Sequence, residues 1–295
     1  MNNNLPFGGK IMLMGGDFRQ LLPVVKNGTR SEMVNLSIKF SKLWKNCIKF
    51  TLTKNMRTLP EELEFAEYLL NVGNGSLNDH EDNLVVPQKC LADKDEDIVQ
   101  SIFKELIEIR KYGDLAKIAV LSARHVDVDE INDRVVQLLD NKKEKIYTGM
   151  DSKDNCDNGE LNNDILPEYL NTLNPPNFPP YKLSLRLNCI VMLLRNISTN
   201  EGLCNGTRLQ ILDLSNNLLK CRILTGDKEN DIVFIHRVTL YCENVYPFTF
   251  KRRQFPIKMA FAMTVNKSQG QTFEKVGIDL RKDIFNHGQL RVRMQ

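Results

Sequence analysis

The chain has 295 residues, of which 42% are hydrophobic and 26% charged, and its net charge is +3. It contains no apolar run of about 18 residues and no secretory leader at its first residues, which excludes a membrane span and secretion from our expectations. The seven cysteines are scattered without a C-x-x-C pair, so neither a zinc site nor a disulfide framework is indicated, and we expect reduced thiols and no metal site.

The first part of the chain predicts alternating strands and helices. Residues 10–16 (KIMLMGG) form an apolar run ended by two glycines, as in a buried strand that opens into a loop. Residues 17–23 would then lie at the carboxyl edge of a sheet, where open α/β sheets bind ligands. The pattern predicts a helix, a strand and a second helix over residues 31–44, 46–53 and 61–70.

The middle of the chain continues the pattern. Helical spacing over residues 98–109 and 125–139 flanks a short apolar run at 117–121, which predicts a parallel sheet covered by helices. Residues 149–163 are rich in Asn and Asp and are predicted to form a flexible loop. The proline-rich stretch 174–180 (NPPNFPP) predicts a rigid turn.

After this turn the pattern changes to short β runs. Four of them predict a small barrel-like insertion, over residues 183–194, 207–214, 218–224 and 231–240. The α/β character returns at residue 257 and closes with a strand over 276–280.

The segment GGDFRQLLPV at 15–24 carries the first candidate site. Asp17, Arg19 and Gln20 follow the first predicted strand, and a guanidinium beside an amide is suited to reading a phosphate group. A turn capped by Asp and Arg for structural reasons would have the same appearance. The segment LTKNMR at 52–57 also follows a predicted strand and ends in Arg57, for which a structural ion pair is the alternative.

The segment FAMTVNKSQGQT at 261–272 is the strongest candidate. Ser268 and Gln271 match the S-x-x-Q capping pattern and predict a helix that begins there, next to Lys267. Amide groups at a helix start and a lysine attract phosphate, whereas a capped helix with a solvated lysine is the alternative. Arg252 and Arg253 form a further basic stretch that could neutralise phosphates.

Taken in this order, the three segments resemble motifs III, IV and V of the Pif-one-type DNA helicases, a RecD-like branch of superfamily one. The stretches LLRN at 193–196 and GLCNGTRL at 202–209 resemble the approach to the small SH3-like insertion of that family, and QFPI at 254–257 resembles its approach to motif V. The sequences of these motifs are most similar to those of the helicases of Helitron-type transposons.

The resemblance implies an α/β fold with the end of one RecA-like domain and a second RecA-like domain that carries an SH3-like β insertion. The expected boundaries are 1–58, 59–182, 183–255 and 256–295. It also implies a helicase that uses ATP and Mg²⁺ and moves 5′ to 3′ on single-stranded or forked DNA. Such a helicase would be monomeric and would act in repair, recombination, telomere maintenance or rolling-circle transposition. We expect it in the nucleus, with the mitochondrion as the alternative.

The resemblance assigns roles to single residues. Gln20 and Arg57 would be the catalytic residues, Gln20 sensing the γ-phosphate and Arg57 contacting it, and Asp17 would also bind the nucleotide. Gly270 would let the backbone approach the nucleotide. The DNA contacts would come from two stretches, made up of Thr264, Asn266, Lys267, Ser268 and Gln269, and of Arg252 and Arg253.

Two departures from the family pattern set the alternatives. Residues 1–295 contain no G-x-x-x-x-G-K-[ST] phosphate loop, and the final motif starts at FNHGQL (285–290) but continues as RVRMQ. We therefore expect the chain to be the downstream part of such a helicase. The alternatives are a remnant that binds single-stranded DNA without hydrolysis and a poorly folded transposon relic.

Overall fold

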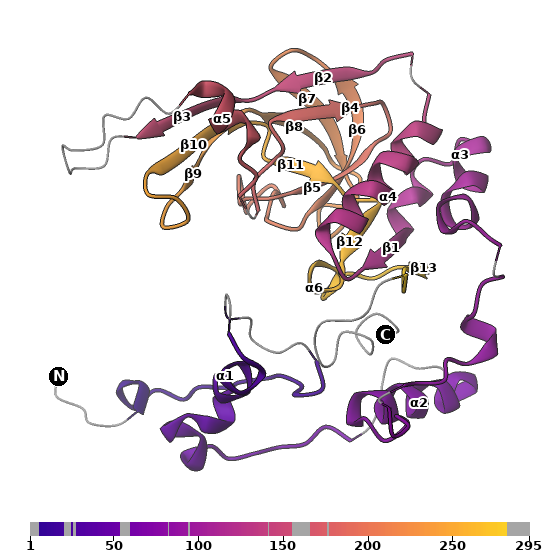
Figure 1. The fold of residues 1–295 in the computed structure, drawn as a ribbon, viewed down its shortest axis with the longest axis vertical. Coiled ribbons are helices and arrows are strands. Elements are labelled where there is room, and N and C mark those ends of the chain that lie inside the picture. Colours follow the sequence, from indigo (N-terminus) through magenta and orange to yellow (C-terminus); the bar gives the residue numbers. More distant parts are fainter. Residues whose placement is uncertain are drawn as a thin grey trace. The chain divides into compact units, whose positions relative to one another are not determined.

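The computed structural model describes residues 6–20, 25, 28–53, 60–81, 83–93, 95–140, 142–154, 166–175 and 177–281. The chain divides into two compact units, one formed by residues 1–93 with 280–295 and the other by residues 94–279 (Figure 1). The domain boundaries expected at 58, 182 and 255 stay predictions.

Short helices form the regular structure of the described part of residues 6–93. The two α-helices are α1 (Arg30–Asn35) and α2 (Leu63–Asn74), and 3₁₀ turns cover Pro6–Gly9, Ile38–Phe40, Lys42–Asn46, Pro60–Glu62 and Gln88–Cys90. The predicted helix over 61–70 is confirmed. The predicted helix over 31–44 is broken into three pieces, because the hydroxyls of Ser37 and Ser41 each accept an amide hydrogen bond that starts a new turn.

The two strands predicted at 10–16 and 46–53 are not formed. Ile11, Leu13 and Leu52 are more than nine-tenths exposed, and their segments have no regular structure. The physical reason is that a strand is stabilised by hydrogen bonds to a neighbour, and no described residue of this unit lies in a strand.

The second unit contains a parallel sheet covered by helices. Its strands, in the order β12-β1-β13, are Ala262–Thr264, Ile118–Ser122 and Lys275–Ile278, and both pairings are parallel. Helix α4 (His125–Leu138) packs on β1 and β12, and the helix formed by a π turn at Gln100–Lys104 and α3 (Glu105–Glu108) packs on β1 and β13 (Figure 1). A 3₁₀ turn at Asp114–Lys117 precedes β1. The predictions of a strand at 117–121, flanking helices and a closing strand near 276–280 are confirmed.

Gly277 in β13 allows the helix before α3 to approach the sheet closely. A Cβ atom at Gly277 would lie 3.0 Å from Ile102 and 3.2 Å from Ile98. Any side chain here would push the helix away from the sheet, since interiors are packed to contact distance.

The remaining strands form the β insertion and its surroundings. They are β2 (Lys145–Thr148), β3 (Met150–Asp154), β4 (Lys182–Leu185), β5 (Ile190–Leu193), β6 (Arg208–Leu214), β7 (Leu218–Ile223), β8 (Ile232–His236), β9 (Val238–Cys242), β10 (Thr249–Gln254) and β11 (Ile257–Met259). They pair in the orders β11-β5-β6-β7-β8, β3-β10-β9 and β2-β4, all antiparallel.

The β region therefore uses strands from both sides of the predicted insertion. Strand β3 contradicts the first part of the flexible loop predicted over 149–163, because its polar residues pair in register with β10; residues 155–163 lie outside the described residues. The proline-rich stretch is free of helix and strand in its described residues, and α5 (Pro167–Thr172) precedes it.

One hydrophobic core extends from the parallel sheet into the five-stranded sheet, and a smaller core of Leu170, Leu173, Cys242 and Phe250 lies under β9 and β10. Fully buried Arg208 on β6 donates to the carbonyls of Ala116 and, at 3.0 Å, Ala260, which precede β1 and β12. Burial lowers the pKa of Arg208 to about 10. This arginine links the insertion to the amino ends of the parallel strands.

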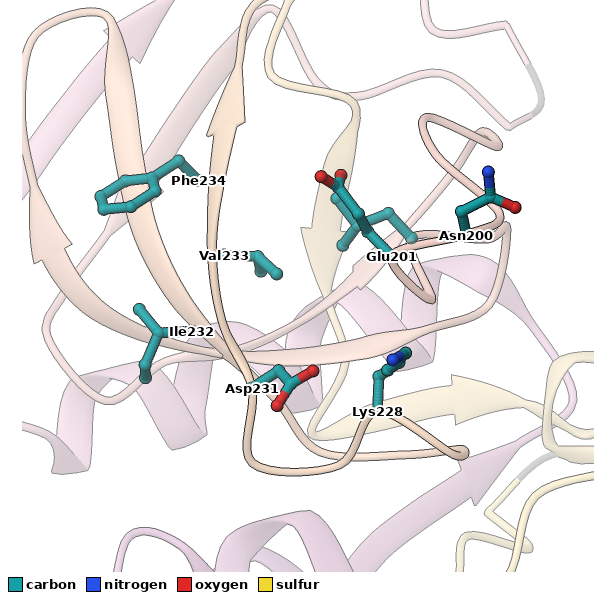
Figure 2. Close-up of a pocket in the computed structure, with 8 residues that line it drawn as sticks. Asn200, Glu201, Lys228, Asp231, Ile232, Val233 and Phe234 are labelled. Carbon is teal, nitrogen blue, oxygen red and sulfur yellow. The ribbon is translucent and has the colours of Figure 1, made fainter.

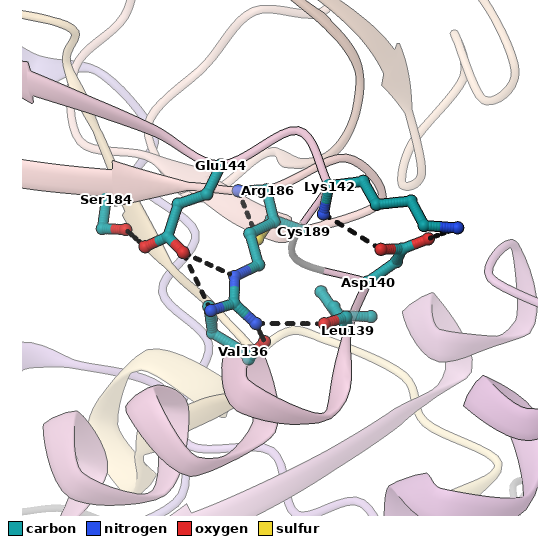
Figure 3. A network of polar contacts seen from close by, with 8 residues as sticks. All are labelled: Val136, Leu139, Asp140, Lys142, Glu144, Ser184, Arg186 and Cys189. Carbon is teal, nitrogen blue, oxygen red and sulfur yellow. Dashed lines mark hydrogen bonds and ion pairs between the residues drawn. The ribbon is translucent and has the colours of Figure 1, made fainter.

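Arg186 makes a second link, at the carboxyl end of α4 (Figure 3). Its Nη1 group donates to the carbonyls of Val136 at 2.9 Å and Leu139 at 3.0 Å, and the Val136 carbonyl also accepts the amide of Leu139 at 3.1 Å. Its other nitrogens bind Glu144, whose pKa is lowered by the hydroxyl of Ser184 and by the guanidinium. The guanidinium therefore caps the helix where many helices use a glycine.

Candidate nucleotide and nucleic-acid interface

The carboxyl ends of β12, β1 and β13 meet at one edge of the parallel sheet. Ser122 and Thr264 are register partners there, and the Ser122 hydroxyl donates to Asp279 Oδ2 at 3.3 Å just after β13. All three residues are buried. Ligands of open α/β sheets bind outside this edge, so the strand ends define the place to look for chemistry.

Asn132 of α4 holds β12 in position. Its Oδ1 accepts from the amides of Phe261 and Ala262 at 3.0 and 2.9 Å, and its Nδ2 donates to the carbonyl of Ala262 at 3.1 Å. Sequence reasoning missed this residue. The available signal was an amide placed beside Ile131 and Val135 on the apolar face of a predicted helix, where a polar group needs a partner.

The structure corrects the prediction for residues 264–271. Helix α6 (Val265–Ser268) ends at Ser268 rather than beginning there, and the Ser268 hydroxyl donates to the carbonyl of Val265 at 2.8 Å. The capping pattern was misleading because the strand leads directly into a single helical turn whose cap position is Thr264. Lys267 is thus the third residue of this single turn and does not lie just before a helix start, as the pattern had predicted.

The predicted DNA contacts at this edge differ in accessibility. Thr264 and Ser268 are buried, Lys267 is half-buried, and Asn266 and Gln269 are exposed. Gly270 has φ of +84°, a left-handed conformation that favours glycine, and a Cβ there would meet nothing within 4 Å. The conformation of Gly270, rather than a close approach, therefore accounts for glycine in the structure.

His125, the first residue of α4, lies near Lys258 of β11 and Lys267 of α6. The pKa of His125 is lowered by burial, then by Lys258, and also by Lys267, while Asp129 opposes them. Burial also lowers the pKa of Lys258, and Lys267 lowers it further. Such effects arise between groups that lie close together, so Lys258, Lys267 and the carboxylate of Asp129 lie near His125, whose lowered pKa favours the neutral imidazole.

Arg252 contradicts its predicted role as a DNA contact. Its side chain is 0% exposed, and it forms two 2.7 Å hydrogen bonds to Asp151, whose side chain is 1% exposed. It also donates to the carbonyls of Pro179 and Leu173 at 3.0 Å each. The guanidinium therefore fastens β10 to the chain around α5 and has no surface to offer to DNA.

Arg253, the next residue, is exposed on the opposite face of β10. There it lines a hollow of about 250 Å³ with Met150, Asp151, Ser152, Thr239 and Lys251. Tyr241, the register partner of Lys251, is 53% exposed, and the Lys251 ammonium lies 5.4 Å from its ring centre. Cations beside an exposed aromatic ring are the groups that bind single-stranded nucleic acid.

The predicted residues of the first unit form a local turn. The amide of Gln20 donates to the carbonyl of Asp17 at 3.1 Å, and the amide of Arg19 donates to Asp17 Oδ1 at 3.0 Å. Arg19 also donates to Asn74 Oδ1 of α2 at 2.6 Å. Arg57 lies outside the described residues. Within those residues, no group of His, Cys, Asp or Glu side chains could hold a metal ion, and no helix is long and apolar enough to cross a membrane.

Solved structures define the class of the fold. The chain matches the crystal structure of Pif1 helicase from Candida albicans with a TM-score of 0.62 and 22% identity, covering 99% of this chain and 63% of that one. It matches the structure of Bacteroides Pif1 helicase in complex with ADP-AlF3 and ssDNA equally well, with a TM-score of 0.62, 22% identity and coverage of 99% and 61%. The chain thus has the RecA-like α/β fold of these helicases, including the β insertion.

Sequence comparison finds similarity to one family of helicases. Residues 1–83 match the family described as PIF1-like helicase, and residues 168–214 match the 2B domain of DNA helicase Pif1. The chain is 28% identical to human ATP-dependent DNA helicase PIF1, and the match covers 99% of this chain and 40% of that protein. It is 25% identical to ATP-dependent DNA helicase PIF1 of Xenopus laevis, and that match covers 98% of this chain and 40% of the relative. It spans about two fifths of these relatives. Together the matches show that the chain is similar to PIF1-like helicases over nearly its whole length.

Proposed function

We propose that this chain forms the DNA-binding part of an ATP-dependent DNA helicase that moves 5′ to 3′ along single-stranded DNA. The observation that carries the proposal is the turn directly after β12, where Lys267 and exposed Asn266 and Gln269 lie at the carboxyl edge of a RecA-like sheet. Positive charge there would bind the phosphates of a strand that crosses this edge.

In this proposal Lys267 supplies charge to a DNA phosphate, while exposed Asn266 and Gln269 donate hydrogen bonds to the sugar-phosphate backbone. Thr264 and Ser268 are buried and position this turn instead of touching DNA. Arg253 and Tyr241 would contact a more distant part of the strand, through charge and stacking. The names of the matched relatives, together with the Bacteroides complex with ssDNA, support DNA as the partner.

ATP enters the proposal through the relatives, which are described as ATP-dependent helicases. The fit of this chain to ATP is incomplete, because residues 1–295 contain no phosphate-loop sequence and no metal-binding group occurs among the described residues. Gln20 and Arg57 would sense or contact a phosphate held by other residues, and no hydrolytic step is assigned to this chain. A second candidate is single-stranded-DNA binding without hydrolysis, which is favoured by the cations Lys251 and Arg253 near the exposed ring of Tyr241.

We further propose that the chain acts as a monomer in the nucleus, in a repair, recombination, telomere or Helitron-type transposition process. The sequence of residues 261–272 supports the role in Helitron-type transposition, because it resembles the sequences of transposon-type helicases. One matched structure is described as unwinding of forked dsDNA by two coordinating Pif1 helicases, so sedimentation of the DNA complex would test the monomer.

The test compares DNA binding and ATP hydrolysis. The whole chain and a chimera with the phosphate-loop segment of the human relative joined ahead of residue 1 are assayed for oligo-dT retention and DNA-stimulated ATPase. The helicase proposal expects salt-sensitive binding by both and ATPase by the chimera. Binding without ATPase in either supports the second candidate, and absence of salt-sensitive binding refutes both.

A matched pair of lysine variants tests the site itself. Lys267→Ala should reduce the slope of log affinity against log salt by about 0.7, the value for one phosphate contact of single-stranded DNA. Lys275→Ala is the control, because Lys275 begins β13 at the opposite edge of the parallel sheet. Equal slopes for the two variants would show that the carboxyl edge does not bind the strand.

A further inference from the structure

Strand β8 borders an open trough. It ends the order of the five-stranded sheet and pairs with β7, and no other strand of the described residues pairs with it. A hollow of about 460 Å³ lies beside it, lined by Asn200, Glu201, Leu203, Lys228, Asp231, Ile232, Val233 and Phe234 (Figure 2). Consecutive strand residues point to opposite faces, so only the edge of β8 can present residues 232, 233 and 234 to one hollow.

The backbone of β8 presents hydrogen-bonding groups to this trough. The amide of Ile223 donates to the carbonyl of Asp231 at 2.9 Å, which sets the phase of the β7–β8 ladder. Two residues on, Val233 and its register partner Cys221 form the next hydrogen-bonded pair. The amides and carbonyls of Ile232 and Phe234 therefore point away from β7, toward the hollow.

The composition of β8 leaves this edge unprotected. Its sequence is Ile-Val-Phe-Ile-His, without the lysine or proline that usually blocks an edge strand. Ile232 is 44% exposed and Phe234 is 54% exposed, so apolar surface accompanies the open backbone groups. Both features are typical of a surface that accepts an added strand.

The opposite wall of the trough is preformed. The loop that carries Glu201 is closed by hydrogen bonds of 2.8 Å from the amide of Ile197 to the carbonyl of Leu203 and from the amide of Leu203 to the carbonyl of Ser198. Gly202 has φ of +74°, and a Cβ there would lie 3.1 Å from the Lys228 side chain. The glycine thus allows this loop and the β7–β8 turn to meet, which closes one end of the hollow.

The charge of the lining selects the class of ligand. Glu201 and Asp231 contribute two carboxylates from two sides, against one ammonium from Lys228. A net negative lining repels nucleic-acid phosphates and attracts a cationic side chain. We propose that the trough beside β8 binds an extended segment of a partner protein, which adds to the sheet as a strand and directs a lysine or arginine toward Glu201 and Asp231.

This interaction is separate from DNA binding and is tested on the whole chain by fluorescence anisotropy. The probe is a fluorescein-labelled peptide, Thr-Val-Lys-Val-Thr, compared with a version that has glutamate for lysine and one that has proline for both valines. The lysine peptide should bind at least about tenfold more tightly than either, because the others lose the charge attraction or the backbone hydrogen bonds.

Two variants and a matched control locate the site. Phe234→Lys places a charge on the edge strand and should weaken peptide binding about tenfold, whereas Leu218→Lys should not. Leu218 lies on the same face but on the inner strand β7, and it is 40% exposed. Glu201→Lys should reverse the preference toward the glutamate peptide, a gain that misfolding could not produce.

Three results would overturn the proposal. The first is equal affinity for the three peptides, or none below about 1 mM. The second is displacement of the peptide by oligo-dT, which would make the trough a nucleic-acid site. The third is sedimentation of the free chain as a dimer that Phe234→Lys dissociates, since a second copy would then be the occupant.

Discussion

Arg252 and Arg253 are adjacent in sequence, and the structure predicts opposite consequences for their replacement. Arg252→Met removes two hydrogen bonds to Asp151 and one to each of the carbonyls of Pro179 and Leu173. It leaves the Asp151 carboxylate 1% exposed without its counterion. Removing one partner of a buried ion pair costs about 3–5 kcal/mol of the free energy of unfolding. Arg253→Met, at an exposed position, should change it by less than about 0.5 kcal/mol.

The assay measures two quantities on each variant: the free energy of unfolding from urea titration followed by far-ultraviolet circular dichroism, and affinity for oligo-dT. Arg253→Met should lower DNA affinity and reduce its salt dependence, as expected for one lost phosphate contact. The double variant Arg252→Met with Asp151→Leu should recover most of the lost stability, because no unpaired charge remains.

The reasoning is refuted if Arg252→Met costs less than about 1 kcal/mol, well below the range for a broken buried ion pair. It is equally refuted if a folded Arg252→Met variant loses DNA affinity while Arg253→Met keeps it. Either result would mean that the Arg252 guanidinium faces solvent and DNA.

Three further predictions concern other described residues. Burial, and then Lys258, lower the pKa of His125 from 6.5, so the unfolded chain binds more protons at this histidine than the folded chain does. The free energy of unfolding should therefore fall more between about pH 7 and pH 5 in the wild type than in His125→Gln, as urea titrations at both pH values would show. Arg186→Lys should cost about 1–3 kcal/mol in the same titration, because an ammonium cannot replace the fork that serves both carbonyls and the carboxylate. Burial raises the pKa of Cys189 to about 12, so peptide mapping after maleimide treatment should find exposed Cys90 labelled and Cys189 unlabelled.

Local patterns predicted those elements whose stabilising partners are also local or nearby in the fold. The apolar spacing of residues 125–139 indicated α4, and the run at 117–121 indicated β1, because each buries its apolar side against the other. The run at 10–16 carries an equally strong strand pattern, yet Ile11 is 97% exposed. An apolar run needs a neighbouring strand as well as a suitable composition, and periodicity does not report whether that neighbour exists.

The candidate site shows the same limit at the level of single side chains. The capping pattern at Ser268 and Gln271 concerns a few local hydrogen bonds, whereas the actual position of α6 depends on β12 pairing with β1 and on Asn132 holding it. For Arg252, an available signal was overlooked. Phe250, Arg252 and Gln254 alternate along a strand and share one face, so a buried Phe250 implies a buried Arg252.

Whether a cationic side chain is available to bind DNA depends on the hydrogen-bond acceptors that surround it in the protein. Arg186, Arg208 and Arg252 donate to backbone carbonyls of other elements, and they join the β insertion to its surroundings. Lys267 and Arg253 lie where strands end or face solvent, so DNA phosphates could serve as their acceptors. A net charge of +3 therefore says little about DNA binding, because arginines whose donors already have protein acceptors release no counterions from DNA. The salt dependence of binding should consequently follow the few accessible cations at the sheet edges and be insensitive to the buried arginines, except where their loss unfolds the chain.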